Sequence, residues 1–336
     1  MRKAVWGTLK VAVPVALGIW LVLHFYRQLD DGQRAALFEA FGRASVPWLV
    51  LSNLLGWLSH VSRGWRWRYL LRHLGHEPGF WSCYHAVMGG YFMNMLLPRA
   101  GEASRAAMLY RTEGVPFEKG FGTILAERAV DMVMLLGIAG VTLLLQADKI
   151  DLFQARIAAF RAQQATGPDG QGLGWWVLAL GVIGAAVAAF LVFTRPNLRA
   201  RVMDGVRGFV EGVRSILRTP DKGPYLFHTA LIWALYVAMF WVGFMALPET
   251  RDVPPAGVMA GFIAGSVGIV LVQGGIGAYP AFVALIVSVY MSGGEGGVIR
   301  PEALAMGWLL WVAQTLMIIS LGGLSLLLVA RKRSTP

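Results

Sequence analysis

Charged side chains recur inside apolar stretches of this chain, at spacings that would bring them to one helix face. Glu102 and Arg105 stand three residues apart, and Glu127 and Asp131 stand four apart with Arg128 between them. Residues three or four apart share a face of an α-helix. Two carboxylates on one face in a medium of low dielectric repel each other unless a cation lies between them or one is protonated. Arg105 and Arg128 are the candidate partners, and a protonated carboxylate could carry a coupling proton.

Two breaks in the apolar pattern could add groups that bind an anion. One lies at Pro98–Gly101 within the polar stretch Asn94–Arg111, and the other is Gln273–Gly277, with the sequence QGGIG. A helix that begins at such a break offers unpaired N–H groups and about half a positive charge, which suits phosphate or carboxylate. Gly274, Gly275 and Gly277 have no side chains, which lets a headgroup approach the backbone of the second break closely. The predicted ligand-binding residues are Asn94, Arg99, Gly101, Glu102, Arg105, Glu127, Arg128, Asp131, Gln273, Gly274, Gly275 and Gly277.

Each of these features also has a purely structural interpretation. Glu127, Arg128 and Asp131 could form an internal salt-bridge cluster that joins helices, although ionisable residues within membrane spans are usually functional. Glu102 and Arg105 could pair with each other near a membrane surface. The glycine run could serve close packing of helices, and Asn94 could cap broken backbone.

The composition is that of a membrane protein. Of 336 residues, 56% are hydrophobic and only 15% charged, and several apolar runs approach the ~20 residues that span a bilayer. The net charge of +11 then indicates basic cytoplasmic loops rather than nucleic-acid binding. A single cysteine, Cys83, excludes an intrachain disulfide and a cysteine-cluster metal site. His24, His60, His85 and His228 lack metal-ligand spacing, so we expect them to be isolated histidines with satisfied hydrogen bonds. We expect no metal and no cofactor.

The predicted fold is an all-α polytopic bundle that forms one integral membrane domain over residues 1–336. The basic stretches Arg63–His76, Arg195–Lys222 and Arg331–Arg333 are expected on the cytoplasmic side, together with the N-terminus. The first apolar run is interpreted as a retained helix, with a cleaved signal peptide as the alternative. The apolar segments are 5–25, 46–62, 80–97, 118–146, 173–194, 224–247, 254–272, 278–291 and 303–330.

These orientations require that some apolar segments do not cross the bilayer. The chain must cross an even number of times between Arg72 and Arg195, yet three apolar segments lie there. We therefore expect about six full spans and two oppositely oriented re-entrant hairpins, at 80–113 and 254–291, in which irregular backbone is buried in protein or lines a wet cavity. The order of elements predicts a possible inverted repeat, with halves at about 1–146 and 173–331. Residues 197–218 alternate basic and apolar groups like a helix on the membrane surface, and 32–44 resemble a short helix outside.

Three motifs taken together resemble a known family. They are Asn94…Pro98…Gly101-Glu102…Arg105, then Glu127-Arg128…Asp131, and finally Gly274-Gly275-Ile276-Gly277. In this order they resemble the lysylphosphatidylglycerol synthase transmembrane region, a family of flippase-like membrane proteins, over nearly the whole chain. The resemblance implies movement of a lipid between leaflets. The family's best-understood members carry a soluble aminoacyltransferase domain after the membrane region; this chain ends at Pro336 without one, so lipid aminoacylation is not implied.

These observations favour a lipid transporter over an enzyme. The expected ligand is a lipid with an anionic headgroup, of phospholipid or polyprenyl-phosphate type, bound near the bilayer midplane. The expected location is a bacterial cytoplasmic membrane with both termini cytoplasmic. The chain shows no nucleotide motif, metal cluster or nucleophile–base pair that would indicate catalysis. Two alternatives stay open: an integral membrane transferase that acts on a lipid-linked substrate, and a scaffold that presents lipids to a separate lipid-synthesis enzyme.

Overall fold

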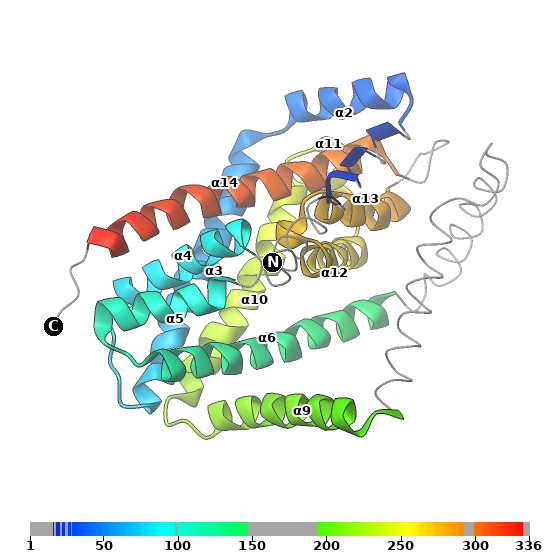
Figure 1. Cartoon of the computed structure of the whole chain (residues 1–336). Helices are drawn as coiled ribbons and strands as arrows, with labels where there is room; N and C mark the ends of the chain where they lie inside the picture. The colour runs from blue at the N-terminus through cyan, green and yellow to red at the C-terminus, as the bar shows by residue number, and fades with distance from the viewer. Residues whose placement is uncertain are drawn as a thin grey trace, which may run out of the picture.

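Helices make up the regular structure of the described chain (Figure 1). The computed structural model describes residues 16, 18–20, 22, 23, 26, 27, 29–97, 100–146, 194–291 and 299–331, and only the backbone of 201, 206, 215, 217 and 273. No strand occurs among these residues, which confirms the predicted all-α membrane bundle. The elements are α2 (Asp31–Arg43), α3 (Val46–His73), α4 (Phe80–Leu96), α5 (Ala100–Glu113), α6 (Phe117–Leu145), α9 (Pro196–Leu217), α10 (Lys222–Phe244), α11 (Pro248–Arg251), α12 (Pro255–Leu271), the 3₁₀ helix η2 (Gln273–Gly275), α13 (Ala278–Tyr290) and α14 (Pro301–Arg331).

Within the described ranges, three helices are long and apolar enough to cross a membrane. They are α6, α10 and α14, with 29, 23 and 31 residues. Each falls within a few residues of a predicted span, namely 118–146, 224–247 and 303–330. Most of the predicted spans 173–194 and 5–25 lies outside the described residues. The total of six crossings therefore stays a prediction.

Helix α3 departs from its predicted length. The apolar segment was expected to end at residue 62 and to be followed by a basic cytoplasmic loop, but the helix continues to His73. Its 28 residues correspond to about 42 Å at 1.5 Å per residue. Arg63 and Arg66 are buried inside the protein, so that part of the prediction was wrong. Charge alone suggested a loop, whereas these side chains have acidic partners on another helix.

Two pairs of short helices stand at the predicted breaks. In each pair, α4 with α5 and α12 with α13, the two helices pack against each other. Helices α12 and α13 contain 17 and 13 residues, or about 26 and 20 Å, which is less than the ~30 Å thickness of the hydrocarbon core. The positions of both breaks are confirmed. Their entry from opposite membrane faces, the inverted repeat and the single-domain boundaries stay predictions.

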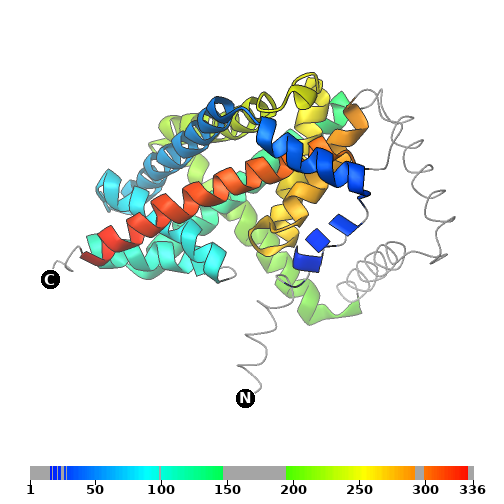
Figure 2. The same cartoon turned by 90° about the horizontal axis from the view of Figure 1, so that it is seen from above.

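The long helices hold these pairs in place. Helix α3 packs along α10, and α14 contacts both α4 and α13, so that it joins the two pairs (Figures 1 and 2). Helix α6 packs between α5 and α9, and α9 lies along its outer side in Figure 1. The two helices approach closely at Gly212, where a Cβ would make van der Waals contact with the Cα of Ala126 at 3.4 Å. The predicted helices at 197–218 and 32–44 correspond to α9 and α2, while their placement relative to a membrane stays a prediction.

Candidate functional site

A cavity of about 1220 Å³ lies between the two breaks. Asn94, Leu97 and Ala100 line it where α4 ends and α5 begins, and Leu271 and Gly274 line it where α12 ends. Side chains of α3, α6, α10 and α14 complete the wall. The lining is mostly aromatic and aliphatic, with a small number of polar groups, as is usual for sites that bind amphiphilic ligands.

Close backbone contact determines the geometry of the first break. The backbone N–H of Gly101 donates to Oδ1 of Asn94 at 2.7 Å, so one of the free donors at the start of α5 is capped by α4. A Cβ at Gly101 would collide with the carbonyl oxygen of Gly90 and the side-chain amide of Asn94. The backbones of α4 and α5 thus meet at two glycines. Capping by Asn94, one of the structural interpretations, is confirmed.

The second break depends on glycines in left-handed conformation. Gly274, Gly275 and Gly277 have φ angles of 64°, 72° and 70°, which side chains with a Cβ rarely adopt. Gly274 lines the cavity, and its carbonyl oxygen accepts from Nε1 of Trp311 at 2.7 Å. Gly275 and Gly277 are buried, and a Cβ at Gly277 would collide with the carbonyl oxygen of Gly18. Gly277 therefore serves close helix packing, whereas Gly274 faces the cavity.

One ion pair stands in the wall of the cavity. Arg128 on α6 donates from Nη2 to Oε1 of Glu102 on α5 at 3.0 Å. Their side chains are 41% and 23% exposed, so both remain accessible to a ligand. The structural interpretation in which Glu102 pairs with Arg105 does not hold, because Glu102 pairs with Arg128. The partner comes from a different helix, 26 residues away in sequence.

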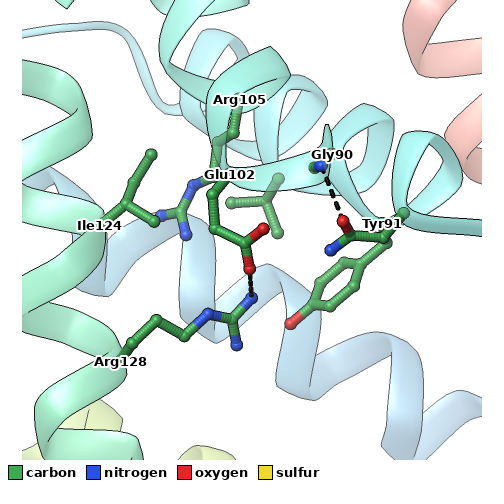
Figure 3. A pocket seen from close by; sticks show the side chains of 9 residues that line it. Gly90, Tyr91, Glu102, Arg105, Ile124 and Arg128 are labelled. Atoms are coloured by element: carbon green, nitrogen blue, oxygen red, sulfur yellow. Dashed lines mark hydrogen bonds and ion pairs between the residues drawn. The ribbon is translucent and has the colours of Figure 1, made fainter. Parts of the chain in front are cut away.

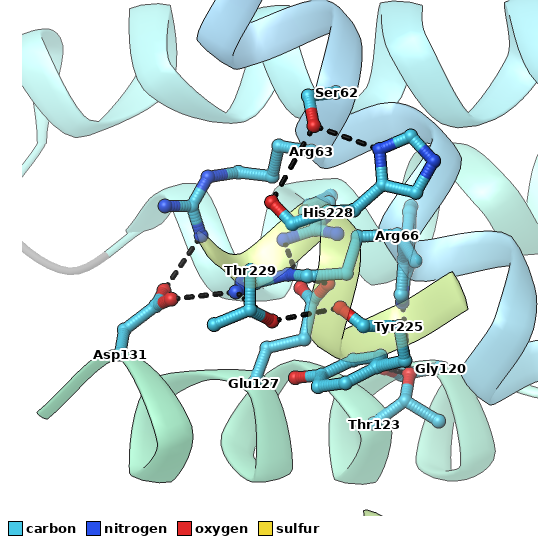
Figure 4. A network of polar contacts seen from close by, with 12 residues as sticks. Ser62, Arg63, Arg66, Gly120, Thr123, Glu127, Asp131, Tyr225, His228 and Thr229 are labelled. Carbon is cyan, nitrogen blue, oxygen red and sulfur yellow. Dashed lines mark hydrogen bonds and ion pairs between the residues drawn. The ribbon is translucent and has the colours of Figure 1, made fainter. Parts of the chain in front are cut away.

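Deeper in the bundle lies a second cluster of charges, which we call the arginine–carboxylate network. It consists of Arg63 and Arg66 on α3, Arg105 on α5, and Glu127 and Asp131 on α6. Figure 4 shows the four members on α3 and α6. All five are buried, and the side chains of Arg66 and Glu127 are 0% and 1% exposed. The network therefore connects three helices, and its most exposed side chain, that of Asp131, is only 11% exposed.

Asp131 is held by both arginines of α3. Its Oδ2 accepts from Nη1 of Arg63 at 2.6 Å, and its Oδ1 accepts from Nη1 of Arg66 at 2.8 Å. Arg66 also donates to the hydroxyl of Thr229 at 3.3 Å. Arg63 donates to the hydroxyl of Tyr236 at 3.4 Å, which extends the network to a residue of the cavity wall.

Glu127 forms ion pairs with arginines of two different helices. Its Oε2 lies 2.8 Å from Nη1 of Arg105, and its Oε1 lies 3.4 Å from Nε of Arg66. The guanidinium of Arg105 also stacks on Trp67, 3.8 Å from the ring centroid. Of the two arginines predicted as partners of the acidic pair, Arg105 is confirmed. The prediction for Arg128 was wrong, because that side chain pairs with Glu102.

Sequence reasoning missed Arg63 and Arg66, because a cluster of four arginines after an apolar run was counted as a cytoplasmic loop. A signal was present in their spacing. His60, Arg63 and Arg66 recur at intervals of three residues, with Trp67 and Leu70 continuing the same face. All five are buried in α3. Continued helical periodicity beyond the apolar run thus indicated a buried polar face.

The remaining predicted site residues are placed as follows. Arg99 lies outside the described residues, and only the backbone of Gln273 is described. His228 and His85 form hydrogen bonds with the hydroxyls of Ser62 and Ser325, as expected. The expectation fails for His60, because both of its ring nitrogens are buried with no hydrogen-bond partner in the described part of the chain. His24 is outside the described residues. No group of three or more potential metal ligands occurs within the described ranges.

The chain matches a known protein family over most of its length. The family described as "Lysylphosphatidylglycerol synthase TM region" matches residues 11–323. This range includes both breaks, the ion pair and the network. No solved structure matches the chain.

Two curated relatives match shorter segments. Glycosyltransferase AglD of Haloferax volcanii is 29% identical over 108 residues, which are 32% of this chain and 17% of the relative. A UPF0104 membrane protein of Methanocaldococcus jannaschii is 30% identical over 92 residues, which are 26% of this chain and 27% of the relative. The matched segments therefore span less than a third of either relative.

Proposed function

The chain belongs to the lysylphosphatidylglycerol synthase transmembrane-region family, and from this premise we propose that it binds the headgroup of an anionic lipid in its cavity and moves that lipid between leaflets. The ligand class is a phospholipid or a polyprenyl phosphate. The membrane is proposed to be a bacterial cytoplasmic membrane, with both termini on the cytoplasmic side because basic residues cluster near α9 and the end of α14.

The observation that carries the proposal is the cavity itself. Its volume of about 1220 Å³ exceeds the ~300–1,000 Å³ of ordinary small-molecule pockets. It therefore has room for a headgroup together with the first part of two acyl chains. Its wall is mostly apolar, and the charged side chains in it, Glu102 and Arg128, come from α5 and α6 beside the first break. A headgroup would lie there while the chains extend along aromatic and aliphatic side chains.

Arg128 is the proposed phosphate contact. Its side chain is 41% exposed and lines the cavity, and a guanidinium presents a planar fork that fits phosphate oxygens. Arg105 is a weaker candidate because it is buried against Trp67 and paired with Glu127. Arg99 and Gln273 stay candidates by position in the sequence alone. In this assignment Arg105, Glu127 and Asp131 hold the wall that carries Arg128.

Arg128→Gln will slow lipid exchange in liposomes. A hydrogen bond to a charged group contributes about 1.5–3 kcal/mol, so we expect exchange of phosphatidylglycerol between leaflets to fall on the order of tenfold or more. The measurement follows the accessibility of headgroup-labelled lipid from the outer side in vesicles that contain purified protein. Arg207→Gln on α9 is the matched control, because its side chain is 71% exposed and pairs only with Asp204 at 3.6 Å within the described chain. Equal rates for wild type, Arg128→Gln and protein-free vesicles, with several anionic lipids, would exclude transport.

A transferase that acts on a lipid-linked substrate is the second candidate. One matched relative is named a glycosyltransferase, and Glu102 is a carboxylate that lines the cavity and could serve as a base. Incubation of the protein with lipid and candidate sugar donors, followed by mass spectrometry, tests it. A product that appears with wild type and disappears with Glu102→Gln would support catalysis. Copurification of a lipid-synthesis enzyme without exchange or product would instead support a scaffold that presents lipids.

A further inference from the structure

Glu102 stands between two arginines. It pairs with Arg128, yet it also lines a hollow of about 10 Å³ together with Arg105 (Figure 3). This hollow has room for about one water molecule. Glu102 and Arg105 lie three residues apart on α5, within the range of direct side-chain contact on a helix. Nε and Nη2 of Arg105 are buried and have no hydrogen-bond partner in the described part of the chain. A second cation with unused donors is therefore within reach of the Glu102 carboxylate.

The charge balance of the region leaves one positive charge uncompensated. The network contains three arginines and two carboxylates, and the Glu102–Arg128 pair adds one charge of each sign. The described part of this region thus carries a formal surplus of one positive charge. A phosphodiester carries one negative charge. A lipid of that class would neutralise the region, whereas a lipid without net charge would leave the surplus in place.

We propose that Glu102 is a positioning residue that exchanges partners when lipid binds, an inference that rests on the proposed function. The phosphate of a monoanionic phosphodiester lipid replaces Glu102 on Arg128, and the Glu102 carboxylate turns to the free donors of Arg105. Glu102 thereby acts as an internal competitor for the headgroup. Its release also removes the ion pair that connects the first turn of α5 to α6, so headgroup binding frees the end of the first hairpin.

The competitor role predicts a gain in affinity when Glu102 is neutralised. Removal of a partly exposed ion-pair partner leaves Arg128 free, so Glu102→Gln will bind phosphatidylglycerol about threefold to fivefold more tightly than wild type. Glu102→Asp keeps the charge and will return the affinity to within about twofold of wild type. The measurement is native mass spectrometry of detergent-solubilised full-length protein titrated with phosphatidylglycerol, with phosphatidylcholine as the lipid of no net charge. The lipid exchange rate of Glu102→Gln will fall despite tighter binding, because the headgroup no longer meets a carboxylate that displaces it.

A loss of phosphatidylglycerol affinity in Glu102→Gln, instead of a gain, would indicate a structural role for Glu102. If Glu102 only held α5 in place, Glu102→Gln would bind phosphatidylglycerol more weakly, and that result overturns the inference. The proposed function would remain intact as long as the wild type binds the lipid through Arg128. Absence of binding by wild type overturns both. Asp204→Asn is the control, since this acid is 72% exposed on α9 and should leave affinity unchanged.

Structure determination of the wild-type protein with phosphatidylglycerol gives a readout that does not depend on variant folding. Glu102 within hydrogen-bonding distance of Arg105, and a phosphate on Arg128, would support the exchange. Glu102 still on Arg128 with the phosphate elsewhere would overturn it.

Discussion

Asp131→Asn will lower the free energy of unfolding by about 3–5 kcal/mol, the usual cost of removing one partner from a buried ion pair. Asp131 accepts from both Arg63 and Arg66, at 2.6 and 2.8 Å, and all three residues are buried. An asparagine can accept from one arginine through its oxygen, but its amide nitrogen would face the other. Three buried arginines would then share the single carboxylate of Glu127. Unfolding in mixed micelles of increasing sodium dodecyl sulfate content measures the loss.

Two further variants distinguish uncompensated charge from loss of packing. Asp204→Asn removes a carboxylate from an exposed pair and should change stability by less than about 0.5 kcal/mol. The double variant Arg63→Gln/Asp131→Asn removes one uncompensated cation as well, so it should be more stable than Asp131→Asn alone. If the double variant loses the sum of both single effects, the two side chains act independently and charge balance in the network is not the cause.

The network gives the proposed site a fixed wall. Asp131 and Glu127 lie on the same helix as Arg128, and their bonds to α3 and α5 hold that helix against both neighbours. Desolvation of the buried charges offsets much of their mutual attraction, so the network adds little net stability. Its main effect is to favour the one arrangement of helices in which every charge has a partner. The exposed pair of Glu102 and Arg128 is therefore the part of the charged region that can respond to a ligand without unpacking the bundle.

The positions of most helices could be predicted because the membrane leaves local signatures. A span needs an apolar run of a certain length, and a break needs glycine, proline or polar residues within one, so α6, α10, α14 and both broken pairs were expected within a few residues. The C-terminal end of α3 was predicted wrongly, because an apolar run marks only the part of a helix that faces lipid. An apolar run ends at Arg63, while the helix continues because its arginines meet Asp131, 68 and 65 residues away in sequence.

The site was predicted as a set of residues but not as a set of partners. Spacing correctly indicated that Glu127 and Asp131 share a face and need cations, because that follows from helix geometry alone. Which arginine approaches which acid depends on how α3, α5 and α6 pack, and this information is not local. Glu102 accordingly pairs with Arg128 across two helices rather than with its neighbour Arg105. Gly101 was predicted as a ligand-binding residue at the start of a helix, and the structure shows that α4 leaves no room for a side chain there.

Gly101→Ala will open the first hairpin. The added methyl group would collide with the carbonyl oxygen of Gly90 and with the Asn94 amide that caps α5. Backbone cannot rotate away as a side-chain end can, so α4 and α5 must separate, and the cap at the start of α5 is lost. Overpacking costs about 1–3 kcal/mol, and loss of a helix cap costs about 0.5–2 kcal/mol. We expect both effects together to lower stability by about 2–4 kcal/mol and to abolish binding of phosphatidylglycerol, because Asn94, Ala100 and Glu102 would leave the cavity wall.

The control for this substitution lies on the neighbouring helix. A Cβ at Gly137 or Gly140 of α6 would meet no atom within 4 Å, so Gly137→Ala and Gly140→Ala should be neutral or raise stability by up to about 1 kcal/mol through the higher helix propensity of alanine. The same unfolding and lipid-binding measurements apply to all three variants. If Gly101→Ala retains both stability and lipid affinity, α4 and α5 do not meet at Gly90 and Gly101 when the lipid binds. The first break would then have to open during transport, and close approach of these two glycines would belong to one stage of the cycle only.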